Sequence, residues 1–66
     1  MYKLYVEERK KLHFVTEDDY LSNIQKIMFY NERDIAEQYN TGLVHFIVFR
    51  NGLEIINEYR YRGQTL

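Results

Sequence analysis

The side chains best suited to acid–base chemistry in this sequence are two histidines, His13 and His45. Neither lies in a metal-ligand spacing such as His-x3-His, and the chain contains no cysteine. We expect His45 to lie across a hairpin from Glu58, and a His–Glu pair can tune a base near neutral pH. No nucleophile, oxyanion donor or cleft-forming loop accompanies the pair, so an ordinary cross-strand charge pair is the favoured interpretation.

Other groups that could carry catalysis have simpler explanations. The acidic run from Glu17 to Asp19 suits the first turn of a helix, where carboxylates interact favourably with the helix dipole. The three glycines, at positions 42, 52 and 63, lie too far apart to form a phosphate-binding loop. The sequence therefore predicts no enzymatic activity, no metal site and no cofactor.

Basic residues suggest nucleic-acid binding as an alternative. Arginines alternate with tyrosines over residues 58–62, and such interleaving can stack bases and contact phosphates. The formal net charge is −1, however, so a solvated turn and a charge-protected edge strand are the favoured interpretation. The nucleic-acid alternative would use six cationic side chains: Arg9, Lys10, Lys11, Arg50, Arg60 and Arg62.

The length of 66 residues predicts a single domain, 1–66. A domain this small buries only about 60% of its unfolded surface, and without cysteine it must rely on dense apolar packing, self-association, or both. The composition, 45% hydrophobic and 17% aromatic, suits that requirement. No apolar run approaches the roughly 20 residues that cross a bilayer, and the N-terminus lacks a signal-peptide core. We expect a cytoplasmic protein that does not contact a membrane.

The clearest local signal is Asn51-Gly52 between two apolar runs, 43–50 and 53–62, which predicts a β-hairpin with a two-residue turn. The register that follows gives four pairs on one face, the better core candidate: Arg50 with Leu53, Val48 with Ile55, Phe46 with Asn57, and Val44 with Tyr59. The other face is mixed and holds Leu43, His45, Ile47 and Phe49, opposite Arg60, Glu58, Ile56 and Glu54.

Residues 16–42 are predicted to be helical. Thr16 is the expected N-cap, and Asn40-Thr41-Gly42 is the expected stop. One buried stripe has helical spacing and comprises Tyr20, Leu21, Ile24, Ile27 and Met28. An unbroken helix would place Asn31 and Gln38 within this stripe, so we expect a break or sharp kink near Tyr30, with Asn31 capping a second short helix.

The first fifteen residues alternate, with Tyr2, Leu4 and Val6 on one face, which predicts a half-buried strand. A three-residue loop at 9–11 would begin a second strand and place Phe14 opposite Val6. The alternative is one long, bent strand.

The expected architecture is an α+β fold in β-β-α-β-β order. It is a small antiparallel sheet of three or four strands, with one kinked or two short helices packed on one face. The opposite face would remain uncovered and carry apolar side chains among charges: Tyr5, His45, Ile47, Phe49 and Ile56.

An uncovered apolar face favours a small protein-binding regulator or inhibitor that self-associates as a homodimer, with another protein of unknown identity as a further partner. By size and composition alone, a compact, tyrosine-rich chain of this kind fits an accessory regulator, such as an inhibitor encoded by a virus or a mobile element. No motif is specific enough to indicate a family. The candidate protein-binding residues are Phe29, Tyr30, His45, Phe49, Tyr59 and Tyr61.

Overall fold

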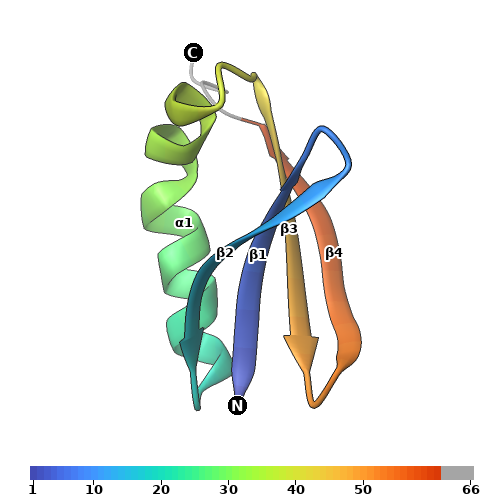
Figure 1. Cartoon of the computed structure of the whole chain (residues 1–66). Helices are drawn as coiled ribbons and strands as arrows, with labels where there is room; N and C mark the ends of the chain where they lie inside the picture. Colours follow the sequence, from blue (N-terminus) through green and yellow to red (C-terminus); the bar gives the residue numbers. More distant parts are fainter. Residues whose placement is uncertain (62–66) are drawn as a thin grey trace.

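The computed structural model describes residues 1–61, with the side chain of Tyr61 outside the description. It contains four strands and one helix in the order β1 (Tyr2–Glu8), β2 (Lys11–Asp18), α1 (Leu21–Gln38), β3 (Leu43–Arg50) and β4 (Leu53–Tyr61). The strands form one antiparallel sheet with the spatial order β2-β1-β3-β4, and α1 lies across one side of it (Figure 1). The predicted α+β fold with a small antiparallel sheet is confirmed.

The hydrophobic core lies between α1 and the two central strands, β1 and β3. Phe46 is the largest side chain that is fully buried there. The core combines alternate residues of the central strands with one stripe of the helix: Leu4, Val6, Val44, Phe46 and Val48 from the sheet, and Ile24, Met28, Ile35 and Ala36 from α1. This alternation places the intervening residues of β1 and β3 on the side of the sheet away from the helix.

The helix α1 is continuous over 18 residues, so the predicted break near Tyr30 is wrong. The conflict that suggested it is removed by a hydrogen bond, because the Asn31 side chain donates from Nδ2 to the Ile27 carbonyl at 2.9 Å. This bond satisfies the amide within the partly buried stripe and leaves the helix intact. Asn31 therefore does not cap a second helix, and Gln38 is simply the last residue of α1.

The helix begins later than predicted, at Leu21, because β2 continues to Asp18. Thr16 is therefore a strand residue and not an N-cap. Asp18 stabilises the strand–helix connection instead, since its Oδ1 accepts from the Tyr20 backbone N–H at 2.8 Å and from the Asn23 side chain at 3.0 Å. These hydrogen bonds hold the pKa of Asp18 below its ordinary value, and the bond from the Tyr20 backbone has the larger effect. Tyr20, predicted to be buried, is 68% exposed.

The helix ends where the sequence predicted. Asn40 adopts a left-handed conformation, with φ of 52°, immediately after the C-cap residue Tyr39. Its N–H donates to the Glu37 carbonyl and that of Thr41 to the Ala36 carbonyl, which together form a Schellman motif.

The first hairpin is present, but its turn contains two residues rather than three. Arg9 and Lys10 both have positive φ, at 55° and 65°, as a type I′ turn requires, and Glu8 pairs with Lys11. The shorter turn shifts the register by one residue. Phe14 consequently pairs with Tyr5, away from the helix, and the prediction that it lies opposite Val6 is wrong.

The second hairpin has the predicted Asn51-Gly52 turn and the predicted first two pairs, but the register then shifts between Val48 and Phe49. Ile55 is the extra residue of this β-bulge, so Val48 pairs with Ile56. Every later pair differs from the prediction: Ile47 with Asn57, Phe46 with Glu58, His45 with Tyr59, Val44 with Arg60, and Leu43 with Tyr61. Ile56 therefore packs against the core instead of lying on the uncovered face.

Candidate functional site

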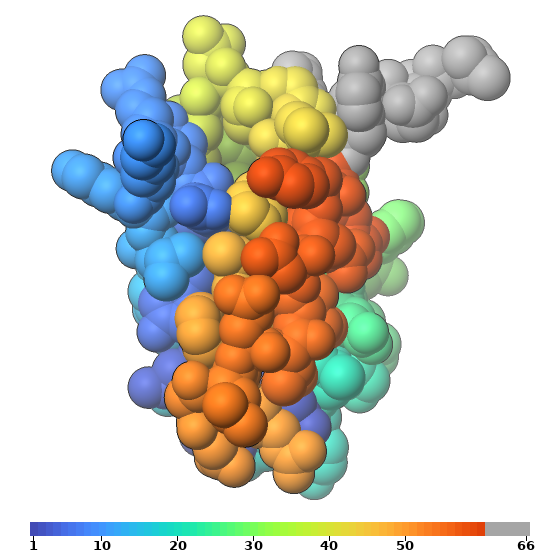
Figure 2. Space-filling model, turned by 90° about the vertical axis from the view of Figure 1, so that its right-hand side faces the viewer, coloured from blue at the N-terminus to red at the C-terminus, as the bar shows by residue number. Residues whose placement is uncertain are grey.

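The side of the sheet opposite α1, here called the open face, is covered by no segment among residues 1–61 (Figures 1 and 2). In Figure 2 it turns toward the viewer, with β1 and β2 in blue, β3 in gold and β4 in orange-red. Residues that pair directly across strands share a face, so the register arranges its side chains in three rows. In the order β2, β1, β3, β4, the lysine row is Glu17, Lys3, Phe49 and Glu54; the middle row is Phe14, Tyr5, Ile47 and Asn57; and the histidine row is Leu12, Glu7, His45 and Tyr59.

An aromatic cluster occupies the centre of the open face. The Tyr5 ring makes edge-to-face contacts with Phe14 on β2, at 5.6 Å between centroids, and with Phe49 on β3, at 5.5 Å. Phe14 is 56% exposed, although it is a large aromatic side chain in the middle row. Ile47, beside Tyr5, is buried although it lies outside the core cluster beneath the helix. The centre of the open face is therefore apolar and in part exposed to solvent.

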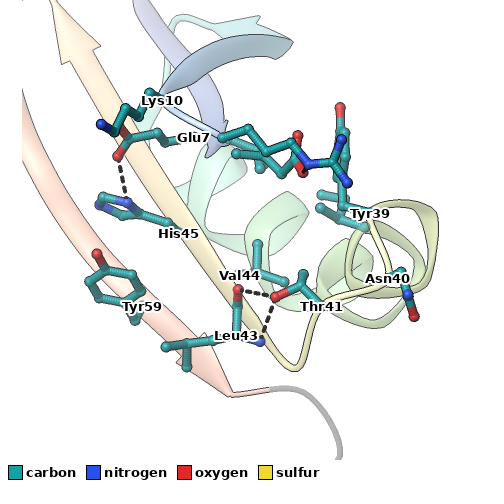
Figure 3. Close-up of a pocket in the computed structure, with 13 residues that line it drawn as sticks. Glu7, Lys10, Tyr39, Asn40, Thr41, Leu43, Val44, His45 and Tyr59 are labelled. Atoms are coloured by element: carbon teal, nitrogen blue, oxygen red, sulfur yellow. Dashed lines mark hydrogen bonds and ion pairs between the residues drawn. The ribbon is translucent and has the colours of Figure 1, made fainter.

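A polar network borders this cluster on one side. His45 Nδ1 lies 2.7 Å from Glu7 Oε1 (Figure 3). The other ring nitrogen of His45 contacts Asn57 Oδ1. Asn57 Nδ2 in turn donates to Glu54 Oε2 at 3.0 Å, which fixes the orientation of the amide. Each ring nitrogen of His45 therefore faces an oxygen atom of a neighbouring strand. The network fixes the His45 ring upright on the open face.

The Tyr59 ring stacks on His45 at 4.2 Å, with only 21° between the ring planes. The predicted pair of His45 and Glu58 is therefore wrong. The bulge at Ile55 moves Glu58 to the helix side of β4, where it accepts from Arg60 Nε at 2.9 Å. The carboxylate beside His45 is supplied by Glu7 on β1, a strand distant in the sequence.

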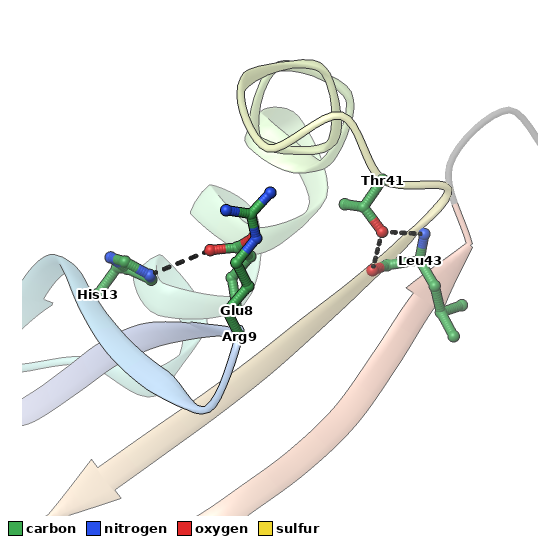
Figure 4. A network of polar contacts seen from close by, with 5 residues as sticks. All are labelled: Glu8, Arg9, His13, Thr41 and Leu43. Atoms are coloured by element: carbon green, nitrogen blue, oxygen red, sulfur yellow. Dashed lines mark hydrogen bonds and ion pairs between the residues drawn. The ribbon is translucent and has the colours of Figure 1, made fainter.

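The second histidine lies on the helix side of the sheet. His13 packs against Tyr39, at 5.0 Å between ring centroids, and its Nε2 lies 3.6 Å from Glu8 Oε1 (Figure 4). Glu8 also contacts Arg9 Nε at 2.9 Å. Consecutive glutamates on β1 thus each contact one histidine, on opposite sides of the sheet.

A shallow hollow opens at the end of the sheet where α1 ends, between the 9–10 turn and the start of β3 (Figure 3). Its rim combines cationic Arg9 and Lys10 with acidic Glu7 and Glu8, so it favours neither sign of charge. The Thr41 hydroxyl accepts from the Leu43 N–H and donates to the Leu43 carbonyl, which satisfies the backbone at the start of β3 (Figure 4).

The structure divides the predicted protein-binding residues between two surfaces. His45, Phe49 and Tyr59 lie together on the open face. Phe29 and Tyr30 form a separate exposed patch on α1, 65% and 73% exposed, with ring centroids 5.3 Å apart. Tyr61 pairs with Leu43 through its backbone, and its side chain lies outside the described residues.

The predicted nucleic-acid-binding residues are not gathered into one patch. The 9–11 segment lies at one end of β1, whereas Arg50 pairs with Tyr2 at the other end and its guanidinium lies 5.5 Å from that ring. Arg60 contacts Glu58, and Arg62 lies outside the described residues.

Sequence reasoning missed three members of the open face that contribute polar contacts or aromatic surface: Glu7, Phe14 and Asn57. Glu7 was on the correct face of its strand, but its contact with His45 depends on β1 pairing with β3, and strand order has no local sequence signal. Phe14 and Asn57 were assigned to the core side because the two-residue turn at 9–10 and the bulge at Ile55 were not anticipated.

Comparisons with protein-family models, curated proteins and solved structures found no match for this chain. Within residues 1–61, no group of three or more His, Cys, Asp or Glu side chains is arranged to hold a metal ion. The one helix in that range is not apolar enough over its length to cross a bilayer. The fold and the surface together define a small α+β domain with one open, aromatic sheet face.

Proposed function

We propose that this protein is a small, non-catalytic, cytoplasmic protein-binding regulator or inhibitor whose contact surface is the open face. One observation carries the proposal: a partly exposed aromatic cluster of Tyr5, Phe14 and Phe49 lies at the centre of a sheet face that no described segment covers. Aromatic side chains are enriched at the centres of protein interfaces, and a polar rim commonly surrounds them.

The surroundings of the cluster support the same function. The network of Glu7, His45 and Asn57 holds polar groups in fixed positions beside the apolar centre. Preorganised side chains lose little conformational entropy when a partner binds. Tyr59, stacked on His45 and 60% exposed, extends the aromatic surface toward the edge strand β4.

A capture experiment with matched variants tests the proposal. The immobilised chain, Phe49→Glu and Phe29→Glu are incubated with native extract, and bound proteins are quantified by mass spectrometry. Both variants introduce the same charge at an aromatic position, but Phe49 is on the open face and Phe29 is 65% exposed on α1.

We expect proteins retained by the wild type to be lost about tenfold or more with Phe49→Glu and kept with Phe29→Glu, because a charge in the centre of an interface lacks a partner. Circular dichroism confirms that each variant is folded. Loss with Phe29→Glu alone would transfer the contact surface to the Phe29–Tyr30 patch, and no selective capture at all would contradict the proposal.

A further inference from the structure

The geometry of the open face points to a second copy of this chain as its occupant, packed face to face with antiparallel strands. This inference rests on the proposed function and names the partner of the same surface. Three properties carry it: the arrangement of charges about the middle row, the bulges in both edge strands, and the size of the face.

The charges of the open face are complementary to themselves. Consider a two-fold axis that lies between the two facing sheets and runs along the middle row, perpendicular to the strands. It would place each strand over the same strand of the other copy, in the opposite direction, and would bring the lysine row of one copy over the histidine row of the other. Lys3 of one copy then lies opposite Glu7 of the other, and the symmetry repeats this contact. Lys3 is exposed and makes no ion pair among residues 1–61, so its ammonium group is available for the contact.

The same axis places aromatic surface against aromatic surface. Phe49 of one copy lies opposite His45 of the other, and the two Tyr5 rings meet near the axis. Glu17 and Glu54 fall opposite the rim residues Leu12 and Tyr59, where carboxylates can remain in contact with water.

The other face-to-face arrangement is less favourable. An axis parallel to the strands, between β1 and β3, would exchange the two central strands and also the two edge strands. Glu17 of one copy would then lie opposite Glu54 of the other, twice. Like charges directly opposed across an interface are destabilising, so the axis along the middle row is preferred.

Sheet twist does not break the proposed contact. Sheets packed face to face cross at about 30°, and Lys3 and Glu7 each lie two residues, or roughly 7 Å, from Tyr5 along β1. A rotation of that size displaces each by only about 4 Å relative to its counterpart, a distance that the flexible lysine side chain spans.

Both edge strands disfavour the competing edge-to-edge assembly. β2 carries an extra residue at Val15, because Leu4 pairs with Thr16 while Tyr5 pairs with Phe14. β4 carries the bulge at Ile55. Bulges distort the row of free backbone groups that an added strand would use, and natural sheets employ them against edge pairing.

The size of the face sets the expected affinity. Four strands about 4.8 Å apart and seven residues long cover a flat area of roughly 400 Å² per copy. Side-chain relief makes the accessible area larger, but the total lies at the low end of specific interfaces. We therefore expect a dimer that forms at micromolar concentrations.

A charge-exchange experiment tests the arrangement by sedimentation equilibrium between about 1 and 500 μM, the range where a small interface associates. Lys3→Glu places a second carboxylate opposite Glu7 of the other copy, and Glu7→Lys places a second ammonium group opposite Lys3 of the other copy. Each variant alone should therefore dimerise about tenfold or more weakly than wild type. In their equimolar mixture both contacts pair opposite charges, and we expect a heterodimer near wild-type affinity.

The matched control makes the same changes of charge on α1, at Lys26→Glu and Asp34→Lys, which are both exposed. These variants should dimerise like wild type, and their mixture should gain nothing. Because Glu7→Lys also removes the His45 contact, circular dichroism checks its fold, and Lys3→Glu alone must still weaken the dimer.

A monomeric wild type over the whole range would overturn the inference, as would a mixture no tighter than the separate variants. Capture of a different protein that depends on Phe49, with a monomeric wild type, would leave the proposed function standing and remove only the second copy. If the wild type is monomeric and also captures no protein in a Phe49-dependent way, both the inference and the proposed function are contradicted.

Discussion

The turn of the first hairpin should be improved by replacing Arg9-Lys10 with Asn-Gly. Both residues have positive φ, 55° and 65°, a conformation that costs an ordinary residue about 1–2 kcal/mol and that asparagine and glycine adopt more readily. The replacement also loses the contact of Arg9 with Glu8, but the Arg9 side chain is 87% exposed, so screening makes that pair worth at most a few tenths of a kcal/mol. The glycine in place of Lys10 also increases the conformational entropy of the unfolded chain, which lowers the free energy of unfolding by roughly 0.5–1 kcal/mol. We expect a net gain of about 1 kcal/mol in the free energy of unfolding.

The second hairpin supplies the reciprocal control. Asn51 and Gly52 have φ of 51° and 81°, and a Cβ added at Gly52 meets no atom within 4 Å, so Asn51→Arg with Gly52→Lys tests backbone conformation without a clash. This change should cost about 1–2 kcal/mol. Thermal denaturation at one protein concentration measures both variants, and 1 kcal/mol corresponds to a shift of about 4–8 °C in Tm for a domain of this size. A lower Tm for the Asn-Gly variant at 9–10 would refute the reasoning.

Three further predictions concern the core, the helix and its start. Phe46 is fully buried, so Phe46→Ala should lower the free energy of unfolding by about 3–5 kcal/mol, which is most of the stability of a domain this small. Urea denaturation measures this loss, and a midpoint that hardly moved would contradict the prediction. Asn31→Leu should raise the free energy of unfolding by roughly 0.5–1 kcal/mol, because leucine has the higher helix propensity and suits a partly buried stripe. A loss above about 1 kcal/mol would instead show that the hydrogen bond from Asn31 to the Ile27 carbonyl contributes more than leucine gains. The folded-state pKa of Asp18 lies below the ordinary value of 3.8, so its stabilisation is present above that pH and is lost as the pH falls through the folded pKa. Asp18→Asn should therefore show a smaller loss of stability on acidification, and identical acid profiles for the two proteins would exclude this role.

The sequence was sufficient for the elements whose signals are local. Asn51-Gly52 forms the expected turn, Asn40 ends the helix in a left-handed conformation, and the alternation in β1 places Leu4 and Val6 in the core. Each of these depends on residues only a few positions apart. The helix break was predicted wrongly because the polar Asn31 looked incompatible with a buried stripe, and the bond that accommodates it is visible only in the folded chain.

The composition of the open face depends on register, which the local pattern leaves ambiguous. In β4 the adjacent residues Ile55 and Ile56 are equally apolar, so either could face the core. Without a bulge, Asn57 would lie opposite the fully buried Phe46, and burying its amide without a partner would cost about 1–3 kcal/mol. The bulge at Ile55 avoids that cost and turns Asn57 toward His45 on the open face, where it is hydrogen-bonded.

Val15 has a comparable effect in β2. The extra residue packs against the core and shifts the following residues, so that Glu17 pairs with Lys3 on the open face and Asp18 reaches the connection to α1. In a regular strand, Glu17 would instead lie on the helix side, opposite Tyr2. Each hairpin thus combines a two-residue turn with one bulge in its outer strand, and both bulges place polar side chains at the margins of the aromatic cluster. A surface with an apolar centre and fixed polar margins has the anatomy of a protein interface, and here that anatomy arises from one extra residue in each edge strand.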